Sequence, residues 1–123
     1  MAWQFAADRP IYSQLVDYIN MFIIGGRFPV GSRLPSVRDL AAEAKVNPNT
    51  MQRALAELEA KGLVYTERTS GRYVTEDAAR IGATKEELAQ KRIGQFFLDM
   101  ESLGFGWEQA LSMAAETGGK GRG

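Results

Sequence analysis

The 123-residue sequence contains neither cysteine nor histidine. Their absence excludes disulfides, thiolate chemistry, the most common zinc ligands and the side chain most often used as a general base. The sequence also lacks long apolar runs. The longest run, residues 21–24, is far too short to cross a membrane. The N-terminus lacks the basic start and apolar stretch of a signal peptide, so we expect a cytoplasmic protein.

The sequence also lacks a recognisable catalytic arrangement. Carboxylates such as those of Glu57 and Glu59 are present, but there is no paired acid and base, no nucleophile elbow and no phosphate-binding loop. We therefore predict that the protein is not an enzyme and that it uses no cofactor or metal.

An excess of charge of either sign is absent, since 15 basic side chains balance 15 acidic ones. The distribution is uneven. Residues 1–75 carry nine basic and seven acidic side chains, a net charge of +2, whereas residues 76–123 carry six and eight, a net charge of −2. This difference weakly indicates a basic front part and an acidic rear part.

Three helices are predicted in the first half of the chain. Apolar side chains recur at helical spacing over residues 10–25, 37–44 and 48–61. Ser36 and Asn47 each precede one of these stretches and are favourable N-cap residues. The second and third helices are separated only by a tight connection, which is typical of a helix-turn-helix.

A β-hairpin is predicted directly after the third helix. Residues 63–68 and 72–75 alternate as strands do, with a turn between them at residues 69–71. Residues 32–34 are expected to add a short strand. The order of three helices and a hairpin predicts a winged helix-turn-helix over residues 1–76.

The rear of the chain is predicted to be helical. Residues 76–83 are interpreted as a linker, and Thr84 with Glu87 matches a capping box that would begin a helix reaching about Leu103. A short helix follows from Trp107, within a two-helix dimerisation segment at residues 77–117. Residues 118–123 are predicted to form a disordered tail. The fold class is therefore mainly α with one small β-hairpin.

The third helix has the composition of a DNA recognition helix. Its first turn is polar and compact, and its opposite face is apolar. Asn and Gln side chains can pair with adenine, and Arg can pair with guanine, which assigns such a role to Asn49, Gln52 and Arg53. Free backbone N–H groups at a helix start also bind phosphate.

Four sequence blocks resemble the GntR family of bacterial regulators. They are residues 10–15, 31–41, 46–55 and 58–64, in that order along the chain. The short two-helix rear is similar to the YtrA-type subfamily. The resemblance implies a transcription regulator that binds operator DNA, with its own operon and membrane-transporter genes as expected targets.

The resemblance also implies roles for individual residues. Arg38 matches a phosphate- or base-contacting arginine, and Gly71 matches a wing-tip glycine that approaches the minor groove. Thr69 replaces the first of two glycines usual at the wing, and Arg72 is expected to add a phosphate or minor-groove contact. The complete set of expected DNA-binding residues is Ser36, Arg38, Asn47, Asn49, Thr50, Gln52, Arg53, Ser70, Gly71 and Arg72.

Simpler roles remain open for several of these side chains. Arg38 would also suit a salt bridge within its helix, and Asn47 is better suited to capping than to reading a base. Arg33 and Lys45 would serve equally as surface charges. For Arg68, an ion pair and a DNA contact are equally compatible with the sequence.

The apolar stripe in the rear is predicted to be a dimer interface rather than a cofactor pocket. An apolar stripe at helical spacing is more often core or interface, and twofold self-association is its simplest use. The expected interface residues are Leu88, Ile93, Phe96, Phe97, Met100, Leu103, Trp107 and Leu111. The leading hypothesis is a homodimeric repressor that binds inverted half-sites in double-stranded DNA. The alternative is a winged-helix protein adaptor, and the sequence identifies no small-molecule effector.

Overall fold

The computed structural model describes residues 3–121, which form five helices and one two-stranded antiparallel sheet. The predicted fold class, mainly α with one small hairpin, is confirmed. The chain divides into two compact units between Lys85 and Glu86, whereas the predicted domain boundary follows residue 76. Within the described part of the chain, no helix combines the length and apolar character needed to span a bilayer.

The first unit is built on three helices: α1 (Ile11–Ile24), α2 (Val37–Ala44) and α3 (Pro48–Ala60). Their bounds agree with the predicted helices to within one residue at every end. Helices α1 and α2 both pack on α3, so α3 is central to this unit. Its core is formed by the apolar stripes predicted from helical periodicity, which include Leu15, Ile19, Ile23, Leu40, Met51, Leu55 and Leu58.

Both predicted N-caps are present in the helix-turn-helix. Ser36 Oγ accepts a hydrogen bond from the Asp39 N–H at 3.1 Å, and Asn47 Oδ1 accepts one from the Asn49 N–H at 2.7 Å. Lys45 ends α2 in the left-handed conformation, with φ of 59° and ψ of 46°. The Val46 N–H then donates to the Ala41 carbonyl, which closes the turn between α2 and α3.

The wing follows α3 without a long connection. Gly62 adopts a φ of +79°, which allows the chain to leave α3 and enter β1 (Val64–Glu67) directly. Strand β1 pairs with β2 (Gly71–Val74) in antiparallel register. The loop that contains Arg33 lies along the other edge of β2, where the Leu34 N–H donates to the Arg72 carbonyl at 2.8 Å. The expected short strand at residues 32–34 is thus a single β-bridge.

An ordered N-terminal segment also belongs to this unit, and the sequence analysis did not predict it. The buried side chain of Gln14 accepts a hydrogen bond from the Ala6 N–H and donates to the Ala6 carbonyl. Tyr18 bonds both backbone groups of Gln4 in the same way. Trp3 packs on the aromatic rings of α1 and donates from Nε1 to the Glu43 carboxylate in α2. The segment therefore links α1 to the helix-turn-helix.

Helix α4 (Ala78–Ser102) begins earlier than predicted, so the interpretation of residues 78–83 as a linker is wrong. The Asp77 carboxylate accepts hydrogen bonds from the Ala79 and Arg80 N–H groups and acts as the cap. Ile81 packs against the core of the first unit, which stabilises the added turns. Thr84 is an interior helical residue whose hydroxyl donates to the Arg80 carbonyl, rather than the predicted cap.

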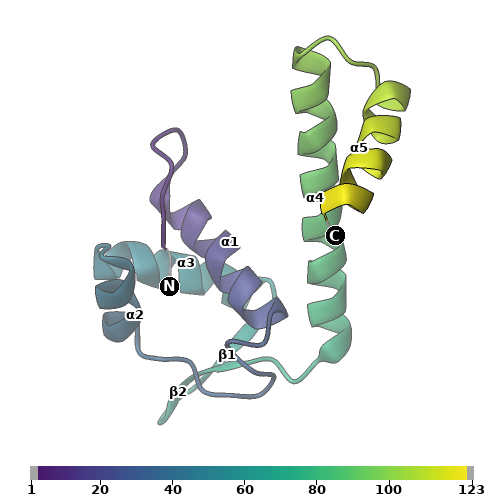
Figure 1. The fold of residues 1–123 in the computed structure, drawn as a ribbon. Helices are drawn as coiled ribbons and strands as arrows, with labels where there is room; N and C mark the ends of the chain where they lie inside the picture. The colour runs from purple at the N-terminus through teal and green to yellow at the C-terminus, as the bar shows by residue number, and fades with distance from the viewer. Residues whose placement is uncertain (1–2, 122–123) are drawn as a thin grey trace. The chain divides into compact units, whose positions relative to one another are not determined.

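Helix α5 (Trp107–Gly121) is longer than the short helix expected from the sequence. It runs back from the turn after α4, in the opposite sense to α4 (Figure 1). Residues 118–121 continue this helix, which corrects the prediction that they are disordered. Once a helix has formed, each added residue gains a hydrogen bond that can offset the low propensity of glycine. Residues 122 and 123 of the predicted tail lie outside the described residues.

Candidate DNA interface

The solvent-facing side of α3 carries the polar residues predicted to read DNA. Asn49, Gln52, Arg53 and Ala56 are exposed and follow one another at helical spacing, whereas the opposite stripe is buried. With other described residues, the Asn49 and Gln52 side chains form no hydrogen bond or ion pair. Thr50 is half-buried at the edge of this stripe. The helix therefore presents unoccupied amide groups toward solvent and anchors itself by its apolar side.

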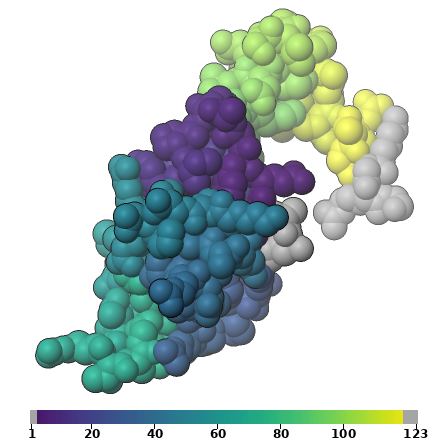
Figure 2. Space-filling view, turned by 90° about the vertical axis from the view of Figure 1, so that its left-hand side faces the viewer, coloured from purple at the N-terminus to yellow at the C-terminus, as the bar shows by residue number. Residues whose placement is uncertain are grey.

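The start of α2 lies beside this surface. Arg38 is exposed, and its guanidinium forms no ion pair with another described residue. The alternative role of Arg38, a salt bridge within α2, is therefore absent among the described residues. Lys45 and Asn47 are exposed at the turn between the two helices. Figure 2 shows α2, α3 and the projecting hairpin on one face of the first unit. Several basic and amide side chains are thereby brought onto a single surface.

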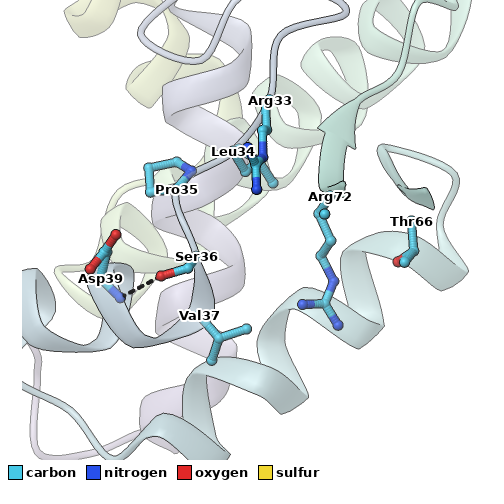
Figure 3. Close-up of a pocket in the computed structure, with 9 residues that line it drawn as sticks. Arg33, Leu34, Pro35, Ser36, Val37, Asp39, Thr66 and Arg72 are labelled. Atoms are coloured by element: carbon cyan, nitrogen blue, oxygen red, sulfur yellow. Dashed lines mark hydrogen bonds between the residues drawn. The ribbon is translucent and has the colours of Figure 1, made fainter. Parts of the chain in front are cut away.

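A groove of about 680 Å³ separates the wing from the start of α2 (Figure 3). Arg33, Gly71 and Arg72 line its wing side, and Ser36 and Asp39 line its α2 side. Arg33 is exposed, so its charge is available at the groove. Inside the groove, the Asp39 carboxylate would repel an anion on the α2 side, so the exposed charge of Arg33 makes the wing side of the groove the more favourable place for an anion.

Arg72 has a partner within the protein, and its expected DNA contact stays a prediction. Its side chain is only 19% exposed, and its Nε lies 3.6 Å from the Glu59 carboxylate in α3. The same carboxylate accepts a hydrogen bond from the Thr66 hydroxyl of β1 at 2.8 Å. Arg72, Thr66 and Glu59 thus join the wing to α3, and the available arginine of the groove is Arg33.

The wing is stiffened by contacts between its side chains as well as by the pairing of its two strands. Tyr65 and Tyr73 are paired across the strands with their rings stacked at 5.7 Å, and the Tyr73 hydroxyl donates to Ser70 Oγ. Burial, followed by the charges of Glu76 and Glu67, raises the pKa of Tyr65 above its ordinary value of 10.0. Tyr65 therefore remains neutral near pH 7 and adds no negative charge to the wing.

The backbone of the wing tip requires glycine. Gly71 has a φ of +119°, and a Cβ at this position would lie 3.2 Å from Arg33 Nε. Gly71→Ala is expected to lower the free energy of unfolding by about 1–2 kcal/mol, because an L-residue is strained in this region. Urea denaturation measures the change.

Gly82 provides the matched control for this substitution, since it is helical and an added Cβ would have no atom within 4 Å other than those of its chain neighbours and its own helix backbone. Gly82→Ala is expected to stabilise the protein by up to ~1 kcal/mol through helix propensity. Equal urea midpoints for the two variants would contradict a conformational requirement at Gly71.

Three residues of this surface were missed or left undecided in the sequence analysis. Arg33 lines the groove, Ala56 completes the exposed stripe of α3, and Tyr12 in α1 lies under the Arg53 guanidinium. The spacing of Ala56 after Asn49 and Gln52 is a signal that could have identified it. No local pattern connects Tyr12 with Arg53, because they come from different helices.

The predicted dimer residues are apolar side chains that the second unit leaves wholly or partly uncovered. Ile93, Leu103, Trp107 and Leu111 are each more than half exposed, and Leu88, Phe96, Phe97 and Met100 are half-buried. Residues 93, 96, 97 and 100 follow helical spacing and define the apolar face of α4. Among the described residues, no group of acidic side chains is placed to hold a metal ion.

A helix-turn-helix with an exposed polar recognition helix and an adjoining hairpin defines the winged helix-turn-helix class of DNA-binding regulators. The sequence profile described as "Bacterial regulatory proteins, gntR family" matches residues 11–74. The chain belongs to the GntR family.

Relatives agree with this assignment over most of the chain. YhcF of Bacillus subtilis, an HTH-type transcriptional regulator, is 37% identical over 88% of this chain and 89% of its own. The HTH-type transcriptional repressor YtrA of the same organism is 34% identical over 77% and 78%, which supports the predicted YtrA-type subfamily. A GntR family regulator from Listeria monocytogenes has a structure similar to this one, with a TM-score of 0.82, 39% identity and coverage of 91% of this chain and 98% of that one. These relatives are transcription regulators rather than enzymes.

Proposed function

We propose that the protein is a homodimeric repressor that binds inverted half-sites in the control region of its own operon. The observation that carries the proposal is the exposed stripe of α3, whose Asn49, Gln52 and Arg53 side chains suit the edges of bases in a major groove. The name of the relative YtrA, a transcriptional repressor, supports repression as the outcome of binding.

The rest of the same surface supports a contact with the DNA backbone. Arg38 at the start of α2 and Arg33 beside the wing are both exposed and positively charged. The start of α3 adds backbone N–H groups that favour an anion. We assign phosphate contacts to these two arginines and to Thr50, and a minor-groove approach to the wing tip around Gly71.

The second unit carries the surface through which we propose that two chains pair. Large apolar side chains on α4 and α5 are exposed in a single chain, and a patch of this kind usually marks a protein contact. Twofold pairing through this unit gives two recognition helices, which then meet half-sites about one helical turn, roughly 34 Å, apart. Inverted symmetry of the operator follows from the symmetry of the dimer.

Titration of the purified protein with its own upstream DNA tests the proposal. We expect a specific complex with two protein chains per operator, and an affinity that falls by about 10³-fold or more between 50 and 200 mM salt if six or more phosphates are neutralised. The control is a DNA of the same length and composition with a scrambled sequence. Equal affinity for both DNAs would refute a sequence-specific regulator, and no binding at low salt would favour a protein adaptor.

A further inference from the structure

One recognition-helix side chain is held by a residue outside the helix-turn-helix. The guanidinium carbon of Arg53 lies 3.6 Å from the centre of the Tyr12 ring, well within the range of a cation–π contact. Tyr12 belongs to the first turn of α1 and is half-buried, so the folded unit restricts the motion of its ring. Arg53 remains exposed above it.

The contact occupies the face of the guanidinium and leaves its edges available. The N–H groups of arginine lie in the plane of the group, so stacking and hydrogen bonding to a base do not compete. Glu57, one helical turn after Arg53, is the natural ion-pair partner, but it pairs with Lys61 at 3.6 Å. With the described residues, Arg53 accordingly forms no ion pair.

We propose that Tyr12 is a positioning residue for DNA recognition, because it holds the Arg53 guanidinium flat with its donor edge directed to a guanine. This inference rests on the proposed function. A long side chain normally loses rotamer freedom when it binds, and the stack imposes much of that order before DNA arrives. Tyr12 thereby contributes to affinity and base preference through Arg53.

A double-mutant cycle tests the coupling between the two residues. Arg53→Ala is expected to weaken operator binding by about tenfold and to relax the preference at one base pair. Tyr12→Leu is expected to weaken it by about two- to fivefold and to relax the same base pair, since an exposed cation–π contact has this magnitude. The double variant should bind no more weakly than Arg53→Ala alone.

Tyr12→Phe is the matched control, because it retains the ring and removes only the hydroxyl. It should bind within about twofold of the natural protein, and thermal melts of all variants show whether the fold is kept. Additive effects of Tyr12→Leu and Arg53→Ala would overturn the inference. A loss in Tyr12→Phe equal to that in Tyr12→Leu would do so too, since it would identify the hydroxyl as the active group.

Two further outcomes separate this inference from the proposed function. Tighter binding by Tyr12→Leu would mean that the stack keeps Arg53 away from DNA, which overturns the positioning role while the regulator remains. Failure of the natural protein to prefer its operator over scrambled DNA would instead refute the proposed function itself.

Discussion

Ile93→Asp is expected to convert the proposed dimer into monomers. Ile93 lies on the apolar face of α4 and is 55% exposed in a single chain, so the substitution should leave the fold of the protomer intact. In a twofold dimer each copy would bury an unpaired carboxylate, at about 3–5 kcal/mol for each. Operator affinity should fall by at least ~100-fold, because each half-site is then bound separately. Sedimentation equilibrium measures the mass.

Leu98→Asp is the control for this experiment. Leu98 is equally large and 61% exposed, but it lies five residues after Ile93, which places it about 140° around the helix and off the apolar face. The Leu98→Asp protein should remain dimeric, and its affinity for the operator should be unchanged. If both variants stayed dimeric, the apolar face of α4 would not be the interface.

Leu55→Ala is expected to lower the free energy of unfolding by about 2–5 kcal/mol, the usual cost of removing a large aliphatic core side chain. Leu55 is 1% exposed and lies on the buried stripe of α3. For a small domain this loss is a large fraction of the total stability. Urea denaturation provides the measurement, and DNA binding should fall only in proportion to the unfolded fraction.

Gln52→Ala is the complementary change on the opposite side of the same helix. Because Gln52 is exposed, the free energy of unfolding should change by less than ~0.5 kcal/mol. Operator affinity should nevertheless fall by about 1–3 kcal/mol, with relaxed preference at one base pair. A destabilised Gln52→Ala protein with unaltered base preference would show that this side of α3 does not face DNA.

The sequence by itself determined the three front helices, their buried stripes and the caps of the helix-turn-helix. These features depend on short-range physics, since a cap such as Ser36 or Asn47 bonds a backbone group two or three residues away. Helical spacing likewise assigned Leu55 to the core and Gln52 to the surface. The four family blocks added the roles expected of Arg38 and Gly71.

The start of α4 shows where local signals compete. Thr84 with Glu87 has the pattern of a capping box, but the Asp77 carboxylate already caps the chain and Ile81 packs on the core. A helix that has already begun continues through a second potential cap residue when the side chain of that residue can bond the preceding turn. The Thr84 hydroxyl does so by donating to the Arg80 carbonyl. Packing against the first unit decided between the two starts.

Only the tertiary structure decided which charged and aromatic side chains meet. Arg53 stacks on Tyr12 and Arg72 turns toward Glu59, although each arginine looks like a free DNA ligand in the sequence. Sequence periodicity indicates which side of a helix is polar. The partner of a long side chain depends on which other element packs across that helix. Because α1 packs across α3 and the wing folds back on α3, these contacts exist only once the helices are assembled.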